Sequence, residues 1–344
     1  MIRVLIVDDS LFIRTILRDL LKDSPDIEVV GTAVNGIDAL EKISALKPDV
    51  VTLDIEMPRM NGLETLEALQ DVRAKPKVIV LSTLTSRQAD MTHQALRLGA
   101  DDFMLKPRDV PNVRGIEREL IQKIRNLVTL PTIVKSTEVR RDEADAIVLI
   151  GSSAGGPPML DTLLSALPPD LPAAVVVTQH MPEGFTASLA ERLNRVSALP
   201  VKETGNGDSL DTGTVLISKA GFHTVISGVA SGNGKNHGRI IHSTAPRLHA
   251  VRPAVDKTFA SAARVFGPRT VAVLLSGMGN DGGEGMLAVK TAGGKTMVCA
   301  EEDCLVYGMA RSALTRDCVD KVVPFEGLAR EIARAVGKLE VNHV

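Results

Sequence analysis

Residues 1–10 read MIRVLIVDDS, and this stretch decides the fold of the amino-terminal half. A mostly apolar run at residues 2–7 ends at two aspartates, which is typical of a strand buried on both faces of a parallel sheet. An amphipathic stretch from Ser10 to Lys22 follows, and its first serine is suited to capping the N-terminus of a helix. The stretch therefore predicts one strand followed by one helix.

The same strand-then-helix pattern repeats through the first part of the chain. Further strands are expected at Glu28–Ala33, Asp49–Leu53, Lys77–Leu81 and Asp102–Leu105, and further helices near 36–46, 61–72, 86–98 and 112–127. This alternation predicts an α/β domain over residues 1–127 with a doubly wound, flavodoxin-like (βα)5 arrangement.

A polar stretch without periodicity at residues 128–144 predicts an interdomain linker. Alternation then resumes, with strands expected at Ala146–Ile150, Ala173–Thr178 and Thr270–Leu275, and helices near 156–166, 183–195, 254–266 and 283–292. A glycine-rich segment at Gly228–Gly238 is expected to join two weaker strands. We expect residues 145–344 to form a second doubly wound, mainly parallel α/β domain with a small antiparallel part.

The composition excludes several classes of protein. The chain has 344 residues, which fits two packed domains, and its net charge of −2, absence of Trp and single Tyr disfavour nucleic-acid binding. Its three cysteines, Cys299, Cys304 and Cys318, contain no CxxC pair, so a disulfide framework or thiolate zinc site is not expected. The apolar run at the amino terminus is too short for a signal peptide or membrane span, which predicts a cytoplasmic location.

Acidic and polar residues follow the predicted strands of the first domain. Asp8 and Asp9 end the first strand, Asp54 the third, Ser82 the fourth and Lys106 the fifth. The carboxyl ends of parallel strands meet at one edge of the sheet, so we expect these groups to converge. Carboxylates that converge favour a hard cation such as Mg²⁺, although any one aspartate after a strand is more often a cap or turn residue.

With these residues, the first domain resembles response-regulator receiver domains. The resemblance rests on DD at 8–9, Asp54 followed by MP at 57–58, Gly62, Ser82, and KP at 106–107. It implies that Asp54 accepts phosphate from a sensor histidine kinase of a two-component system, and that Ser82 and Lys106 bind the phosphoryl group. It further implies that Phe103 is the switching aromatic, and that Mg²⁺ is held by Asp8, Asp9, Asp54 and the carbonyl of Glu56.

The segment Gly151-Ser152-Ser153-Ala154-Gly155 follows the first strand of the second domain and satisfies G-x-S-x-G with Ser153 at its centre. This spacing favours Ser153 over Ser152 as a nucleophile. A phosphate-binding glycine loop is disfavoured, because prolines stand where a Walker loop needs lysine and Ser153 stands where the dinucleotide fingerprint needs glycine. A structural glycine turn remains open on this segment alone.

A serine nucleophile needs a base and a group that orients the base. His180 follows the strand expected at Ala173–Thr178, and Asp281 lies in the glycine-rich loop after the strand expected at Thr270–Leu275. We therefore expect Ser153, His180 and Asp281 to lie together, with the loop's backbone N–H groups available for an oxyanion. Taken alone, a histidine after a strand is more often a hydrogen-bonding residue than a catalytic base. Taken alone, Asn280-Asp281-Gly282 indicates a turn and helix cap as strongly as a catalytic aspartate.

With these residues, the second domain resembles the catalytic domain of the chemotaxis protein-glutamate methylesterases, the CheB family. The matching motifs are GSSAGG at 151–156, TQHMP at 178–182, RPAVD at 252–256 and LSGMGNDG at 275–282. The resemblance implies phosphorylation-activated hydrolysis of glutamate methyl esters, and deamidation of glutamines, on methyl-accepting chemotaxis receptors. It also implies an oxyanion site at the Met278 backbone and no cofactor for the esterase.

Two positions depart from the family pattern. Ala154 stands where some relatives have Thr, and Ala254 stands where Ser is common. Two other interpretations stay open: a receiver joined to a non-enzymatic binding module, and an esterase or amidase that acts outside chemotaxis.

Overall fold

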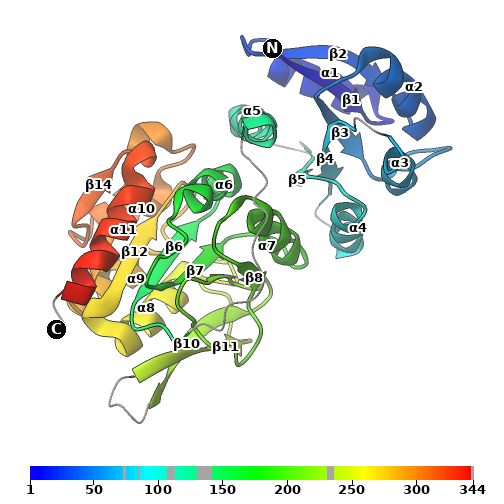
Figure 1. The fold of residues 1–344 in the computed structure, drawn as a ribbon. Helices are drawn as coiled ribbons and strands as arrows, with labels where there is room; N and C mark the ends of the chain where they lie inside the picture. The colour runs from blue at the N-terminus through cyan, green and yellow to red at the C-terminus, as the bar shows by residue number, and fades with distance from the viewer. Residues whose placement is uncertain (73–74, 84–85, 107–112, 130–141, 231–235, 342–344) are drawn as a thin grey trace. The chain divides into compact units, whose positions relative to one another are not determined.

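A computed structural model describes residues 1–72, 75–83, 86–106, 113–129, 142–230 and 236–341. The chain divides into two compact units, Met1–Leu130 and Pro131–Val344. Each unit has its own parallel sheet (Figure 1).

The first unit is built on a five-stranded parallel sheet in the order β2-β1-β3-β4-β5. Its strands are β1 (Ile2–Val7), β2 (Ile27–Ala33), β3 (Val50–Asp54), β4 (Lys77–Ser82) and β5 (Asp102–Leu105). Its helices are α1 (Leu11–Leu21), α2 (Gly36–Leu46), α3 (Gly62–Leu69), α4 (Ser86–Arg97) and α5 (Val113–Thr129). This strand order is that of the flavodoxin-like fold, so the predicted fold is confirmed.

Local chemistry explains where these helices begin. The Ser10 side chain accepts the N–H of Ile13 at the start of α1, as its N-capping position predicts. At the start of α3, Asn61 and Glu64 form a reciprocal capping box. The strands supply the core, with Val4 among the fully buried residues.

The second unit is built on a seven-stranded parallel sheet in the order β14-β13-β12-β6-β7-β9-β8. Its strands are β6 (Ile147–Ser152), β7 (Ala174–Gln179), β8 (Val201–Glu203), β9 (Val215–Ile217), β12 (Thr270–Leu274), β13 (Lys295–Cys299) and β14 (Lys321–Val323). Its helices are α6 (Gly156–Ala166), α7 (Phe185–Val196), α8 (Val255–Phe266), α9 (Gly283–Thr291), α10 (Gly308–Leu314) and α11 (Phe325–Val341), with 3₁₀ turns η1 (Gly267–Arg269) and η2 (Glu301–Asp303).

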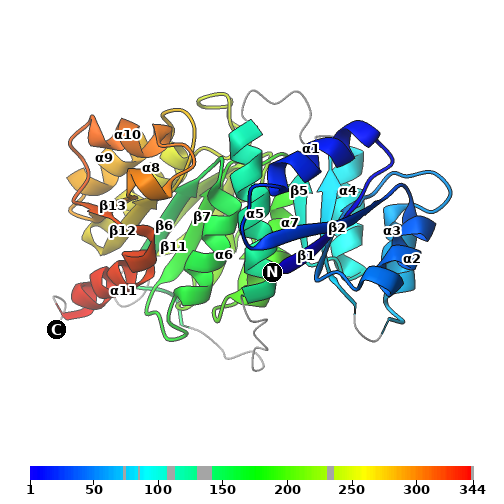
Figure 2. The same ribbon diagram turned by 90° about the horizontal axis from the view of Figure 1, so that it is seen from above.

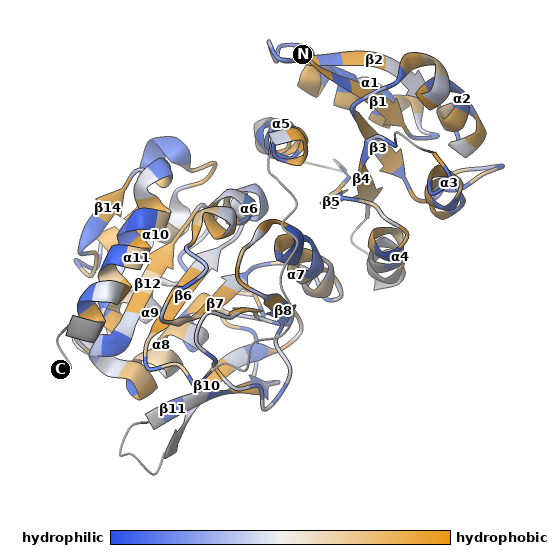
Figure 3. Cartoon of the chain, in the orientation of Figure 1, coloured by the Kyte–Doolittle hydropathy of each residue, from blue (hydrophilic) through white to orange (hydrophobic). Residues whose placement is uncertain are grey.

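Alternate residues of the central strands pack against different layers of helices. Val148 and Ile150 belong to a hydrophobic cluster with α6, α7 and α11, whereas Ile147 and Leu149 belong to a cluster with α8, α9 and α10. Figure 2 shows α8, α9 and α10 on one side of this sheet and α6 and α11 on the other. The apolar colouring in Figure 3 is concentrated on the strands between them. The doubly wound arrangement expected for this half is confirmed.

The expected antiparallel part is a two-stranded sheet of β10 (His223–Ala230) and β11 (Asn236–Ser243). The glycine-rich segment Gly228–Gly238 lies at their junction, and both of its ends pair within the strands. Its central residues, 231–235, lie outside the described residues.

The boundary between the units differs in detail from the predicted linker at 128–144. Helix α5 continues to Thr129, and residues 130–141 lie outside the described part of the chain. The last residues of the predicted linker join the second unit, where the N–H of Ala144 donates to the Leu210 carbonyl at 2.8 Å. Backbone pairing of this kind leaves no apolar periodicity in the sequence, so it was not predicted.

The three cysteines are buried and unbridged. Within the described residues, no helix combines the length and the apolar character that crossing a membrane requires.

Candidate active site and carboxylate pocket

The carboxyl ends of β6, β7 and β12 meet where the order of the larger sheet reverses, since β6 lies between β12 and β7. Crevices at such points are the usual ligand sites of open parallel sheets. Ser153 follows β6, His180 follows β7 and Asp281 lies in the loop after β12. The structure therefore brings the three predicted loops to one edge of the sheet.

Ser153 lies in a tight turn between β6 and α6. Its N–H donates to the Ser276 carbonyl at 2.9 Å, and its own carbonyl accepts the N–H of Gly156 at 2.9 Å. Gly155 has φ of 77°, a left-handed conformation that suits glycine. The turn thus leaves the strand and enters the helix within four residues, with the Ser153 side chain half-buried.

Gln179 ties the Ser153 turn to the His180 loop, a role that the sequence did not reveal. Its side-chain amide donates to the carbonyls of Ser153 and His180, both at 2.9 Å. Its Oε1 atom accepts the hydroxyl of Ser152 at 2.6 Å. Ser152 is fully buried, and its hydroxyl is engaged by Gln179.

His180 and Asp281 form a direct polar contact at the site. The Nε2 atom of His180 lies 2.7 Å from Oδ2 of Asp281, and the two side chains are 10% and 2% exposed. Asp281 also accepts the N–H of Val255 at 2.7 Å and the N–H of Asp256 at 2.9 Å.

These donors decide the charge of Asp281. Burial alone would raise its pKa, but the hydrogen bonds from His180 and from the backbone of Asp256 and Val255 outweigh burial, and the pKa is lowered. An ionised carboxylate only accepts hydrogen bonds, so the Nε2 atom of His180 bears the proton in this contact. The Nδ1 atom of His180 is then the ring nitrogen with a free lone pair.

Among the described residues, neither the Ser153 hydroxyl nor the Nδ1 atom of His180 makes a hydrogen bond. Contacts between a nucleophile and its base are often long in free enzymes and tighten when substrate binds. The structure thus places the two groups on adjacent strand ends, joined through Gln179, in a state without a direct bond between them.

The loop at residues 277–279 lies next to the Ser153 turn, since a Cβ atom on Gly277 would lie 3.1 Å from the Cβ of Ser153. Gly277 is held through its N–H, which donates to Val306 at 2.8 Å, and through its carbonyl, which accepts from Met309 at 3.1 Å. The N–H of Met278 has no acceptor within the described residues, and the Met278 side chain is 75% exposed. A fixed N–H without an acceptor is suited to bind a developing oxyanion.

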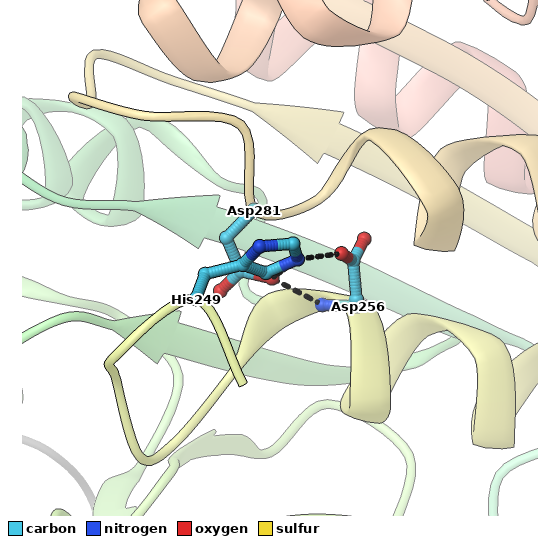
Figure 4. Close-up of side chains that lie close together, drawn as sticks. All are labelled: His249, Asp256 and Asp281. Carbon is cyan, nitrogen blue, oxygen red and sulfur yellow. Dashed lines mark hydrogen bonds and ion pairs between the residues drawn. The ribbon is translucent and has the colours of Figure 1, made fainter. Parts of the chain in front are cut away.

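Asp256 and His249 lie beside Asp281 (Figure 4). The Nε2 atom of His249 lies 2.8 Å from Oδ2 of Asp256 and 4.0 Å from Oδ1 of Asp281. Asp256 belongs to the RPAVD motif, but sequence reasoning gave it no role, and it gave none to His249.

In the first unit, the predicted carboxylate cluster is present. One oxygen from each of Asp8, Asp9 and Asp54 lies within 4.8 Å of the others. The Nζ atom of Lys106 lies 2.9 Å from Asp8 and 2.6 Å from Asp54. Arg14 fixes the first loop by donating to the carbonyls of Asp8 and Asp9 at 2.7 and 2.9 Å.

Burial raises the pKa of Asp54 to about 6, since the opposing effect of Lys106 is smaller and the Asp8 charge adds to the rise. One lysine charge does not balance three carboxylates. The cluster therefore fits a small divalent cation with oxygen ligands, and Mg²⁺ is the cation that such ligands suit.

The other predicted pocket residues lie at neighbouring strand ends. Ser82 ends β4, is fully buried and accepts the hydroxyl of Thr92 at 2.8 Å. The backbone N–H of Glu56 lies 3.4 Å from the Asp54 carboxylate. Pro107 of the KP motif lies outside the described residues.

Phe103 on β5 is buried. The Nζ atom of Lys123 lies 5.7 Å from the centre of its ring and 2.9 Å from the buried Asp102 carboxylate. The sequence did not indicate this buried ion pair.

The chain matches two protein-family models, CheB methylesterase over residues 148–332 and the response regulator receiver domain over residues 4–116. The first match spans more than half of the chain. The chain belongs to the CheB methylesterase family. It is thus a hydrolase with an amino-terminal receiver domain.

Relatives of this CheB chain match along nearly their whole length. A Methanospirillum hungatei protein named protein-glutamate methylesterase/protein-glutamine glutaminase 1 is 58% identical over 98% of each chain. A Thermotoga maritima protein of the same name without the number is 41% identical over 94% of this chain and 95% of its own. The crystal structure of the Thermotoga maritima CheB methylesterase catalytic domain matches with a TM-score of 0.52 at 39% identity, covering 55% of this chain and 97% of that one.

The two departures of this CheB chain do not remove a contact of the site. Ala154 is exposed, and its carbonyl accepts the Ser276 hydroxyl at 2.6 Å. Ala254 is the N-cap residue of α8 and offers no side-chain cap, but the Asp281 carboxylate accepts the first two helical N–H groups instead. The missing serine hydroxyl is therefore replaced locally.

Proposed function

We propose that this CheB chain hydrolyses glutamate γ-methyl esters, and deamidates glutamines, on methyl-accepting chemotaxis receptors through Ser153, His180 and Asp281. One observation supports the proposal above all others: the 2.7 Å pair of His180 and Asp281 lies at the strand end next to the Ser153 turn. The names of full-length relatives support the substrate class.

The proposed proton path follows from the charge of Asp281. Asp281 holds the proton on Nε2 of His180, so Nδ1 accepts the proton of the Ser153 hydroxyl as the serine oxygen attacks the ester carbonyl. The bond to the methoxy oxygen then breaks, and that oxygen takes the proton and leaves as methanol. Water repeats the two steps, releases the glutamate carboxyl group and restores Ser153. With glutamine, the leaving group is ammonia.

The N–H of Met278 is the proposed oxyanion donor. It would stabilise the negative oxygen that forms during each attack, and a single donor of this kind typically contributes about 10²–10³-fold to kcat. Because the donor is a backbone group, substitution of the Met278 side chain is not a test of this role.

The first test is Ser153→Ala, measured as methanol release from membranes with methylated receptors. We expect kcat to fall by at least about 10³-fold, because the proposed covalent intermediate forms on the Ser153 oxygen. Ser165→Ala is the matched control, since this hydroxyl donates to the Thr162 carbonyl within α6. Equal rates for wild type and Ser153→Ala would refute the mechanism and favour a binding module. Cleavage of small esters without methanol release from receptors would move the substrate outside chemotaxis.

For the receiver we propose that Asp54 accepts a phosphoryl group from a histidine kinase of the chemotaxis type. Asp8, Asp9, Asp54 and the Glu56 carbonyl would hold Mg²⁺, which when bound offsets negative charge on the incoming phosphoryl group. The residues of this chain then bind the product: Ser82 and Lys106 contact the phosphoryl oxygens, and Phe103 responds by packing.

Phosphorylation of Asp54 is proposed to raise the esterase rate. A coupling free energy of about 1–3 kcal/mol corresponds to about 5–150-fold in rate. We expect a phosphodonor with Mg²⁺ to stimulate methanol release by wild type within this range and to leave Asp54→Asn unstimulated. Equal stimulation of both proteins would contradict the proposed acceptor.

A further inference from the structure

Two acidic residues at the active site cap each other's helices. Asp281 precedes α9, yet its carboxylate accepts the N–H groups of Val255 and Asp256 at the start of α8. Asp256 lies in α8, yet its Oδ1 atom accepts the N–H groups of Gly282 and Gly285 at the start of α9, at 2.9 and 2.7 Å. The orientation of either carboxylate therefore depends on the other.

Close packing of the two helices allows this exchange. A Cβ atom on Gly285 would lie 2.6 Å from the Cβ of Phe259 and 3.1 Å from the Cα of Asp256. Gly282 has φ of 99°, a left-handed conformation that suits glycine. The close approach at Gly285 requires glycine and keeps α8 and α9 close enough for the shared caps.

Each carboxylate also faces a histidine through its Oδ2 atom, which in Asp281 accepts the Val255 N–H as well. Asp281 pairs with His180, and Asp256 pairs with His249 at 2.8 Å through Nε2. The site thus has two carboxylate–histidine pairs joined by backbone hydrogen bonds, of which the proposed mechanism uses one. All four carboxylate oxygens already accept N–H donors, so we assign no metal ion to this cluster.

The charge of Asp256 bears on His180. Burial raises the pKa of Asp256 and the Asp281 charge adds to the rise, while the hydrogen bonds from the Gly285 backbone and from His249 oppose it without cancelling it. His249 therefore favours the ionised form of Asp256. In that form Asp256 places a second negative charge behind Asp281, which stabilises the positive imidazole that forms when His180 takes the serine proton.

We propose that Asp256 and His249 are positioning residues for ester hydrolysis: they hold Asp281 against His180 and add negative charge behind this pair. This inference rests on the proposed function, because it assigns no chemistry of its own to either residue. Neither residue is proposed to contact substrate, so we expect substitutions of Asp256 and His249 to change kcat and not KM.

The test uses the full chain with methylated receptor membranes and methanol release. Asp256→Asn keeps an oxygen acceptor for Gly282 and Gly285 but removes the charge, and we expect kcat to fall by about 10–100-fold with KM changed less than about 2-fold. His249→Asn suits the left-handed backbone at this position, where φ is 52°, but its amide is too short to reach Asp256. We expect it to lower kcat by about 3–10-fold.

His249→Gln is the rescue variant, because its longer amide retains a donor toward Asp256, and we expect it to restore most of the rate that His249→Asn loses. His242→Gln is the control, since His242 bonds Thr204 and stacks on Phe222 away from the two pairs. Unfolding curves of every variant identify losses of activity that come from instability. If Asp256→Asn fails to fold, His249→Asn and His249→Gln test the inference, because the His249 side chain is partly exposed.

Three results separate failure of the inference from failure of the proposed function. If wild type releases methanol and Ser153→Ala does not, but Asp256→Asn and His249→Asn keep kcat within about 2-fold of wild type, the function stands and the inference is wrong. A rise in KM without loss of kcat also overturns it, since that indicates substrate contact. If Ser153→Ala matches wild type, the proposed function fails and the inference fails with it.

Discussion

Both units place buried carboxylates at the carboxyl ends of parallel strands, yet they treat the charge of those carboxylates in opposite ways. In the receiver, Asp54 is paired with the Lys106 side chain and faces a second carboxylate, Asp8, and its pKa is raised to about 6. In the methylesterase unit, Asp281 accepts two backbone N–H groups and a histidine, and its pKa is lowered.

The difference shows that strand-end placement alone does not determine what an aspartate does. Backbone donors and a histidine favour the ionised form of Asp281, which is what orienting His180 requires. The acidic cluster around Asp54 contains more negative than positive charge, so a bound cation would stabilise its ionised carboxylates.

The largest effect is expected for Asp281→Asn. The amide retains one acceptor oxygen but presents an N–H where His180 needs an acceptor, so the histidine adopts the wrong tautomer. We expect kcat for methanol release to fall by about 10³–10⁴-fold.

Asp54→Asn is the matched substitution in the other cluster. Without a phosphodonor it should leave methanol release within about 2-fold of wild type, because Asp54 has no part in the proposed ester chemistry. A loss of less than about 10-fold for Asp281→Asn would mean that the two clusters do not differ as described.

A smaller effect is expected on stability. The folded pKa of Asp54 is raised from 3.8 to about 6, so the folded state favours the protonated acid. Ionisation therefore costs nothing well below pH 3.8, costs more as the pH rises toward 6, and costs about 3 kcal/mol above 6. Asp54→Asn should raise the free energy of unfolding of the receiver by about 1–3 kcal/mol at pH 7.5, and the gain should shrink toward pH 4.

Native-state hydrogen exchange on peptides from β1 and β3 of the full chain measures this gain within the receiver. Asp281→Asn serves as the comparison. The pKa of Asp281 is lowered in the folded state, whereas that of Asp54 is raised, so removing the Asp281 charge should not stabilise the protein at pH 7.5. A receiver that Asp54→Asn destabilises at that pH would contradict the account of the acidic cluster.

The smallest expected effect is that of Mg²⁺. At ten times its dissociation constant, a bound cation adds about 1.4 kcal/mol to the free energy of unfolding. We expect that gain in the receiver peptides of wild type, a clearly smaller gain in Asp54→Asn, and none in peptides of α8 and α9. If Mg²⁺ slowed hydrogen exchange equally in both units, the proposed difference between the two carboxylate clusters would be wrong.

Much of the fold was predictable because strands buried on both faces are continuous apolar runs. Strand β5 was predicted at its observed bounds, and β7 was displaced by one residue. By contrast, β8 (Val201–Glu203) and β9 (Val215–Ile217) have three residues each, which is too short for a periodic signal. The backbone hydrogen bond between Ala144 and Leu210 was not predicted either, because so short a pairing leaves no periodic signal in the sequence.

The candidate site was predictable only where motifs end strands. Ser153, His180 and Asp281 could be named because each follows a strong strand. Asp256 and His249 could not, because their bonds to the start of α9 and to each other depend on helix packing that has no local signature. The assignment of the His180 proton to Nε2 likewise required the position of Asp281.

The most direct test of the contrast is a carboxyl ¹³C NMR titration of the full chain labelled at aspartate, with Asp54→Asn and Asp281→Asn used to assign the two signals. We predict that Asp54 titrates near pH 6 without Mg²⁺, and that Asp281 stays ionised to below its ordinary value of 3.8. An Asp281 midpoint above 3.8, or an Asp54 midpoint below it, would contradict the account.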